Sequence, residues 1–286
     1  MSNGRNFPLL RMRRQDRNPW LSPITLLPTT FVPLLLLAAA VPGLLAPIAP
    51  DAVDFLAPFQ PPGAAHWFGT DQLGRDVFSR VVHGTAQSLF IGLGATLIAC
   101  AGGVVLGTIT ALAPRPLDRV LVRLLDILLA FPEILLALLV IAVLGREPFN
   151  TSLAVGLAGI AGYARLVRAE VLRVSQSGYV EQAVVIGEPY LAIVAEHIVP
   201  NTIRPLAVLA TVGIGTSLLA ASALSFLGLG VVPPSPEWGA LLADGRNVLD
   251  VAPWVSLLPA TVVALSVISM TLLGRRLQAI LLQKER

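Results

Sequence analysis

The sequence predicts an all-α, polytopic membrane protein, and this fold class rests on composition, apolar segments and the placement of charge. Of the 286 residues, 55% are hydrophobic and only 13% are charged, whereas soluble domains carry about 25% charged residues. The mean hydropathy of the chain is +0.77. Because backbone groups within lipid must be hydrogen-bonded inside their own segment, the apolar stretches are expected to be helices.

Apolar segments long enough to span a bilayer recur along the chain. A helix needs roughly 20 mostly apolar residues to cross about 30 Å of hydrocarbon, and about six segments meet this requirement. They lie at 24–46, 88–112, 121–145, 152–171, 204–230 and 256–274. A split or re-entrant segment would change the count by one. The predicted organisation is a transmembrane domain over 24–274, with a basic tail at 1–23 and a short tail at 275–286.

Arginine and lysine residues give the predicted orientation. Placing the amino terminus in the cytoplasm brings most of the 20 Lys and Arg residues to that side of the membrane. By the positive-inside rule, both termini and the loop at 172–203 are then cytoplasmic, and the loops at 47–87 and 231–255 are external. Topology therefore accounts for the net charge of +3, so we expect contact with membrane lipid and no nucleic-acid partner.

The external segment 47–87 is predicted to end in an amphipathic helix on the outer membrane surface. Asp71 suits its N-cap position, and Leu73, Val77 and Val81 recur at helical spacing. This helix would lead directly into the second span.

Acidic residues within the third predicted span are candidates for intramembrane polar sites. Asp126 and Glu133 lie seven residues apart, hence on one face of a helix and about 10 Å apart in depth. Four arginines lie at depths from which they can pair with these acids: Arg119, Arg123, Arg165 and Arg168. We expect structural ion pairs here. The alternative is a pathway or gating role, which a costly buried acid indicates by default.

No enzymatic or metal-binding pattern is found in the sequence. Cys100 is the only cysteine, so no internal disulfide is expected. His66, His83 and His197 are scattered and predict no metal site. The chain has no G-x-x-x-x-G-K-[ST] loop for nucleotide and no H-E-x-x-H motif, so neither ATP binding nor intramembrane catalysis by this chain is expected.

The segment from Gly178 to Asn201 is a polar, helix-breaking insertion between the fourth and fifth spans. Tyr179 to Ile186 is about two helical turns. Gly187 suits the position just after a helix, and a second helix from Tyr190 to Ile198 is predicted to end at Pro200. The predicted product is a helix-turn-helix whose size fits a groove on a partner.

The spacing within this segment resembles the "EAA" loop of ABC importer membrane subunits: E-A-A, three residues, G, nine residues, then I-x-L-P. Here Gln182 and Val199 depart from that pattern, whereas Gly187 and Pro200 are kept. The resemblance implies that the loop docks on a separate ATPase. The predicted coupling residues are Tyr179, Glu181, Ala183, Gly187, Glu188, His197 and Pro200.

Four further segments narrow the resemblance to the C-type permease subunit of the dipeptide, oligopeptide and nickel group of ABC importers. They are FGTDQLGRDVFSR at 68–80, RLLDILLAFPEILLALLVIAVLG at 123–145, GYARLVRAEVL at 162–172 and LSFLGLGVVPPSPEWGALLADGRNVL at 224–249. The resemblance implies the type I ABC importer permease fold, in the bacterial cytoplasmic (inner) membrane, forming half of a pathway for peptides or a similar small solute. It also implies a B-type sister permease, one or two ATPase subunits that bind ATP and Mg, and an external substrate-binding protein. No cofactor is expected on this chain itself.

The external loops at 68–84 and 231–254 are expected to meet the binding protein, since they form the sizeable outer polar surface. Acidic residues outnumber arginines there, which favours a partner with basic patches. The docking candidates are Asp71, Arg75, Glu237, Trp238 and Asp244.

A proton-coupled secondary transporter, with Asp126 and Glu133 as the proton relay, is the alternative function. It would leave the spacing of Gly187 and Pro200 without a purpose. The identity of the cargo, whether dipeptide, oligopeptide, nickel, glutathione or haem, is not decided by the sequence.

Overall fold

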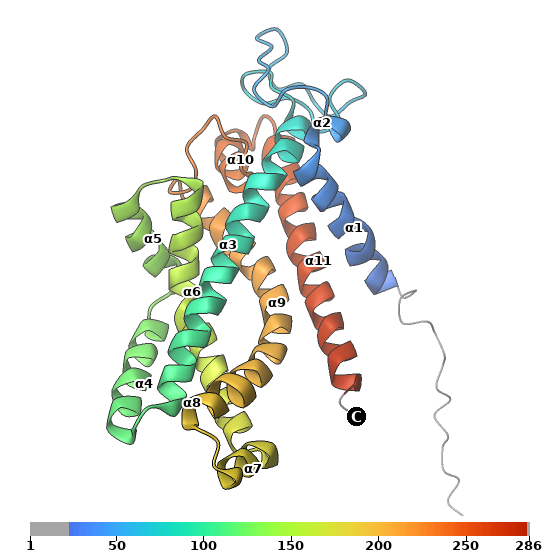
Figure 1. Ribbon diagram of the computed structural model, residues 1–286. Coiled ribbons are helices and arrows are strands. Elements are labelled where there is room, and N and C mark those ends of the chain that lie inside the picture. Colours follow the sequence, from blue (N-terminus) through green and yellow to red (C-terminus); the bar gives the residue numbers. More distant parts are fainter. Residues whose placement is uncertain (1–22, 285–286) are drawn as a thin grey trace, which may run out of the picture.

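The computed structural model describes residues 23–284, and within that range every regular element is a helix. Four long helices form the body of the elongated molecule (Figure 1): α3 (Val77–Leu112), α6 (Pro148–Ser175), α9 (Val199–Phe226) and α11 (Trp254–Lys284). Helix α1 (Pro23–Ala40) packs against α11 and α3. The predicted tail at 1–23 lies outside the described residues apart from its last position, and the tail predicted at 275–286 continues α11 as far as Lys284.

Helices α3 and α6 approach each other closely at small residues. A Cβ atom added to Gly103 would lie 2.4 Å from the Cβ of Tyr163, and one added to Gly107 would lie 2.6 Å from the carbonyl oxygen of Ala164. Only glycine fits at such separations, so this glycine pair on α3 allows the backbones to pack side by side. The α3–α6 pair is thereby the central support of the fold.

Three described helices are long and apolar enough to cross a membrane: Val77–Leu112, Pro205–Phe226 and Trp254–Ile280. Helices α4 (Arg115–Ala130) and α5 (Glu133–Leu144) meet the criterion together but are bent by 90° relative to each other. The first apolar helix is shorter, at Leu26–Ala40. The all-α fold is confirmed, and the count of six spans stays a prediction.

The third predicted span, 121–145, is not one continuous helix. Phe131 adopts an extended backbone with φ −85° and ψ 140°, and Pro132 follows it. Proline disfavours helical geometry in the residue before it and has no N–H to donate, so the helix ends there and α5 starts again at Glu133. The expectation that Asp126 and Glu133 share one helix face is therefore wrong.

The start of α3 also differs from the prediction. Its N-cap is Asp76, whose carboxylate accepts a hydrogen bond from the backbone N–H of Ser79 at 2.7 Å. The N-cap assignment of Asp71 is wrong because Gly69 and Gly74, both at φ +71°, fold that segment into a loop. The amphipathic helix and the second span are a single helix of 36 residues.

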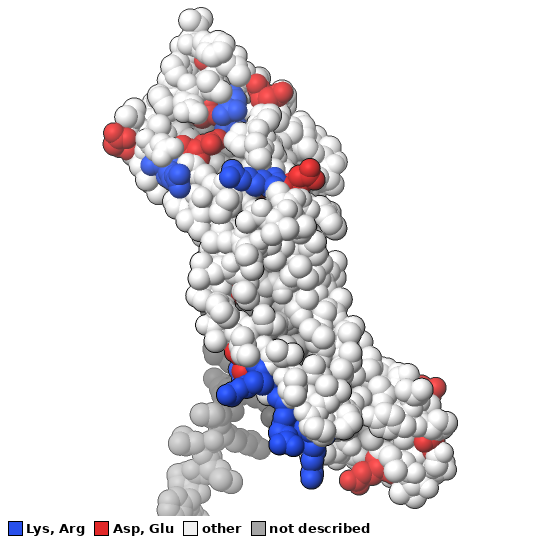
Figure 2. All heavy atoms as spheres, turned by 90° about the vertical axis from the view of Figure 1, so that its left-hand side faces the viewer, with Lys and Arg blue, Asp and Glu red and all other residues white. Residues whose placement is uncertain are grey.

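Charged side chains gather at the two ends of the molecule. On the face that carries α4 and α5, Figure 2 shows Lys, Arg, Asp and Glu near both ends and a nearly uncharged belt between them. One end is covered by the long loop before α3 and by α10 (Trp238–Gly245), and the other carries α7 (Gly178–Ile186). An uncharged belt between charged ends is the surface that a bilayer requires.

Candidate coupling loop and polar clusters

Helix α7 ends as the sequence predicts, at Gly187. This residue has φ +89° and ψ 25°, the left-handed conformation that glycine adopts without the steric cost of a Cβ. The N–H of Gly187 donates to the carbonyl of Val184, and that of Glu188 donates to the carbonyl of Ala183. These bonds close the end of the helix and turn the chain toward its second half.

The second half of the loop differs from the prediction. After α8 (Tyr190–Ala192), the chain forms a π-helix, η2 (Ile193–Ile198), which continues directly into α9. The expected helix end at Pro200 is wrong. Pro200 lies at the second position of α9, where the π-helix passes into the α-helix, and the helical backbone continues through it. π-Helices are rare and occur frequently at functional sites.

One face of the loop packs against α6. Val180 and Ala183 of α7, with Ile193 and Ile198 of η2, are buried in a cluster that includes Val171. Ala183, predicted as a coupling residue, therefore holds the loop to the body of the chain. It presents no side-chain surface to a partner, being only 4% exposed.

The opposite side of the loop is apolar and exposed. We call these residues the apolar tip: Val184, Val185, Ile186, Tyr190 and Leu191. The exposed fraction reaches 85% at Val185 and 78% at Leu191. Tyr179 and Glu181 are exposed beside the tip. An exposed cluster of large apolar side chains at the end of the molecule marks an interaction surface.

A polar contact joins the two halves of the loop. Nε2 of His197 lies 2.9 Å from Oε2 of Glu188, and both side chains are about a third exposed, at 31% and 35% respectively. The sequence placed both residues among the coupling group but did not indicate that they contact each other. The contact fixes the position of the turn that carries the apolar tip.

The acids of the predicted third span have different surroundings. Asp126 lies 2.9 Å from Arg165, which confirms the expected ion pair. Arg168 pairs instead with Asp118, at 2.9 Å. Asp118 was not among the predicted partners, although it lies in the first turn of α4. Among the described residues Glu133 forms no ion pair, so the expected pairing does not extend to it.

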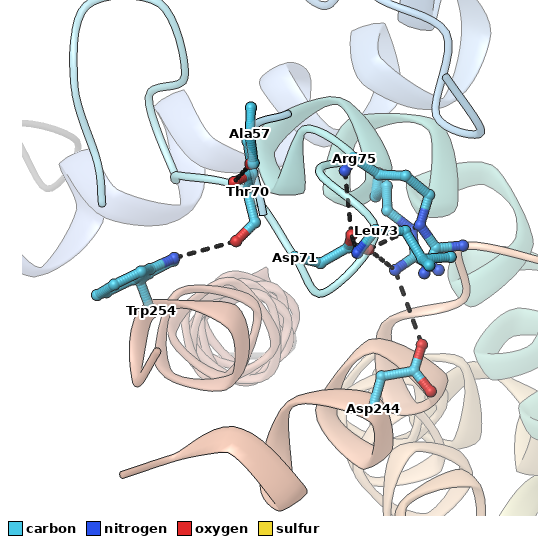
Figure 3. A network of polar contacts seen from close by, with 8 residues as sticks. Ala57, Thr70, Asp71, Leu73, Arg75, Asp244 and Trp254 are labelled. Atoms are coloured by element: carbon cyan, nitrogen blue, oxygen red, sulfur yellow. Dashed lines mark hydrogen bonds and ion pairs between the residues drawn. The ribbon is translucent and has the colours of Figure 1, made fainter. Parts of the chain in front are cut away.

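The end of the molecule that carries α10 contains a buried ionic cluster, drawn in Figure 3. Asp71 accepts hydrogen bonds from Nε of Arg75 at 2.7 Å and from Nη1 of Arg80 at 2.9 Å. Asp244 lies further off, with its Oδ2 3.7 Å from Nη1 of Arg80. Asp71 and Arg80 are each only 2% exposed. Arg80 could not be predicted as a member of this cluster, because the loop that brings Asp71 to it depends on the positive φ of Gly69 and Gly74.

Glu237 and Trp238 are buried as well. The Glu237 carboxylate caps α10 by accepting hydrogen bonds from the N–H groups of Gly239 and Ala240, at 2.8 and 2.9 Å. Burial raises the pKa of Glu237, and the two backbone donors act in the opposite direction. Nε1 of Trp238 donates to the carbonyl of Val81 at 2.9 Å, which ties α10 to α3.

Four of the five predicted docking residues therefore cannot contact a partner directly. They are each less than 9% exposed and hold the loops at this end of the molecule together: Asp71, Arg75, Glu237 and Trp238. Asp244 keeps an exposed side-chain fraction of 29%. The docking hypothesis narrows to Asp244 and the exposed parts of the outer loops.

Comparison with known proteins identifies the family. Residues 103–286 match the model of the binding-protein-dependent transport system inner membrane component. The chain is 38% identical to a probable D,D-dipeptide transport system permease protein of Escherichia coli K12, over 88% of this chain and 85% of the relative. It is 40% identical to a dipeptide transport system permease protein of Alkalihalophilus pseudofirmus, over 75% and 71%. It is 41% identical to a glutathione transport system permease protein of Escherichia coli O6:K15:H31, over 85% and 81%.

The chain belongs to the family of binding-protein-dependent transport system inner membrane components. It is a membrane permease subunit of an ABC importer, with the type I permease fold. This assignment replaces the alternative of a proton-coupled secondary transporter.

Proposed function

We propose that this chain forms half of the translocation pathway of an ATP-driven importer of peptides or a similar small solute, with a B-type sister permease as the other half. The relatives named for D,D-dipeptide, dipeptide and glutathione transport support this cargo class. In this proposal both termini lie in the cytoplasm, an orientation that the distribution of arginines favours. An external binding protein delivers the solute to the end that carries α10.

The loop at 178–201 couples the permease to an ATPase subunit. The single observation that carries this step is the apolar tip, whose exposed valine, isoleucine and leucine side chains stand at the end of the molecule opposite α10. Water is an unfavourable environment for such a cluster, and a groove on a partner would bury it. One or two ATPase subunits fill this role, and they alone bind ATP and Mg.

Tyr179, Glu181 and Glu188 lie around the tip and act as its polar rim. Gly187 and the His197–Glu188 contact set the angle at which the tip is presented. Pro200 and the π-helix join the loop rigidly to α9, so that movement of the loop is passed to a helix of the pathway.

The test introduces an aspartate into the apolar tip and compares the effect with that of an aspartate at a matched exposed site at the other end of the molecule. Val185→Asp and Leu191→Asp should each abolish co-purification of the ATPase subunit and ATP-dependent uptake into proteoliposomes. The control is Val251→Asp, since Val251 is 60% exposed at the outer end. Retained ATPase binding by both tip variants would refute the assignment of the loop.

A further inference from the structure

Glu133 lies near the middle of the membrane-crossing part of the chain. It starts α5 directly after the break at Phe131 and Pro132. A Cβ added to Gly159 of α6 would lie 3.4 Å from Oε1 of Glu133. Gly159 is eleven residues beyond Pro148, so at 1.5 Å per residue Glu133 lies about 17 Å from the outer end of the 28-residue helix α6.

The carboxylate of Glu133 has no cationic partner in the described part of the chain. The arginines that approach this depth, Arg165 and Arg168, are held by Asp126 and Asp118. The side chain of Glu133 is exposed on the isolated subunit. A carboxylate at this depth is costly against lipid, so acids within spans face water-filled cavities or protein. The surface around Glu133 is therefore expected to face away from lipid, toward a second permease subunit or the pathway between the two.

Glu133 contributes to the wall of a cavity of about 240 Å³ between α5, α6 and α9. Thr216 is the other polar side chain of that wall. Ile134, Leu219 and Ala223 also line a second, apolar cavity of about 650 Å³ that extends to α11. A mostly apolar cavity with a few placed polar groups is the usual form of a small-solute site.

The broken helix agrees with this interpretation. Irregular backbone at membrane depth is tolerated only where it is buried in protein or borders a water-filled cavity. In many transporters, solute sites lie near the midplane at such discontinuous helices. Here the break at Pro132 places a carboxylate, rather than backbone alone, at the cavity.

We propose that Glu133, assisted by the hydroxyl of Thr216, binds the positively charged amino group of the peptide while the peptide passes through the pathway. The adjoining apolar cavity accommodates an apolar side chain of the same peptide. A carboxylate at membrane depth is costly unless it is paired or hydrated, and a cationic solute would supply the partner that the described residues do not provide. This inference rests on the proposed peptide cargo.

The first experiment asks whether water reaches Glu133, independently of cargo. Glu133→Cys is introduced with Cys100→Ala, which removes the only native cysteine, and the assembled complex is treated with a water-soluble cationic methanethiosulfonate reagent. The cysteine should be labelled in the resting complex or in the vanadate-trapped complex. The control is Ala154→Cys, because Ala154 is 0% exposed and should stay unlabelled. No labelling of the Glu133→Cys complex in either state would overturn the inference.

The second experiment measures recognition of the amino group. Proteoliposomes with the complete importer receive an equimolar mixture of casein-derived di- and tripeptides, free or N-acetylated, and lumenal contents are measured by mass spectrometry. Glu133→Gln should lower uptake of free-amino peptides by about 10- to 100-fold, the effect of a lost charge-assisted hydrogen bond, and should reduce their preference over acetylated peptides. Glu133→Asp should retain the preference, since it keeps the charge.

The two failures can be distinguished. If the wild-type importer accumulates no peptide of either kind, the peptide cargo of the proposed function is refuted, and this inference with it. If the wild-type importer takes up free-amino peptides and Glu133→Gln does so at the same rate and preference, only the role of Glu133 is refuted.

Discussion

The two ends of the molecule handle polar and apolar side chains in opposite ways. At the end that carries α10, Asp71, Arg75 and Arg80 are buried, with Asp71 hydrogen-bonded to both arginines at 2.7 and 2.9 Å. At the end that carries α7, the Glu188–His197 contact is about a third exposed, and the apolar tip lies outside the protein core. The first end pairs its buried charges within one chain, whereas the second leaves apolar side chains exposed.

A charge-rich segment is therefore not by itself a docking surface. The segment around Asp71 is the most charged part of the outer loops, yet its charges neutralise one another in the interior. The loop around Gly187 carries few charges, and its exposed side chains include Val185, Ile186 and Leu191, at 85%, 79% and 78%. Burial and exposure in the fold, rather than residue type, separate the structural cluster from the interaction surface.

Breaking the buried cluster should have the largest effect. Asp71→Ala leaves Arg75 and Arg80 buried without their shared carboxylate, which should cost about 3–5 kcal/mol of stability. The measurement is the thermal denaturation midpoint of the purified complex in nanodiscs. Asp250→Ala is the control, because Asp250 is exposed and its loss should change stability by less than about 0.5 kcal/mol. Equal shifts for the two variants would contradict the structural role of the cluster.

Changing the turn at Gly187 should affect coupling more than stability. A Cβ at this position meets nothing within 4 Å, so the cost of Gly187→Arg is mainly the positive φ of +89°, about 1–2 kcal/mol. The protruding cation should nevertheless block docking, so that uptake and ATPase association are lost while the permease stays in the membrane.

The matched control at this turn is Gly187→Asn, because asparagine adopts the left-handed conformation more readily and carries no charge. It should retain most of the uptake. Full uptake and ATPase association by Gly187→Arg would contradict the coupling assignment.

Removing the ion pair of Asp126 should lower stability less than removing a buried ion pair does. The Arg165 and Asp126 side chains are 65% and 39% exposed on the isolated chain, so Asp126→Ala should cost about 1 kcal/mol or less. Asp126→Asn keeps a hydrogen-bond acceptor and should assemble better than Asp126→Ala and still transport with ATP. Normal assembly of Asp126→Asn with complete loss of uptake would instead place Asp126 in the pathway.

The smallest expected change comes from Glu188→Gln. The contact with His197 is partly exposed and should contribute about 0.2–1 kcal/mol. The denaturation midpoint should therefore hardly move, whereas the number of ATP molecules hydrolysed per solute imported should rise because the tip is less firmly held. An unchanged ratio would show that this contact has no part in coupling.

The sequence predicted what local physics determines. Hydropathy gave the apolar helices, and the turn at Gly187 followed from the need for a left-handed residue. The pairing of Asp126 with an arginine followed from the cost of an isolated acid within a span.

What the sequence could not predict depends on tertiary geometry. The 90° bend at Pro132 separates Asp126 from Glu133, whereas the apolar pattern of 121–145 predicts one continuous helix. A proline such as Pro200 usually indicates the end of a helix, but here the π-helix passes into α9 and the helix continues through it. The burial of Asp71 depends on Arg80, nine residues away, and on a loop whose path no short-range signal specifies.

Site-specific photo-crosslinking from the apolar tip tests most directly that the inner loop contacts the ATPase. A benzophenone amino acid replaces Leu191, which is 78% exposed, and in a second variant Leu56, which is 94% exposed in the outer loop. Irradiation of the assembled importer should give a covalent adduct with the ATPase subunit from position 191 and none from position 56. Absence of an ATPase adduct from position 191, or an equal yield from position 56, would contradict contact between the apolar tip and the ATPase.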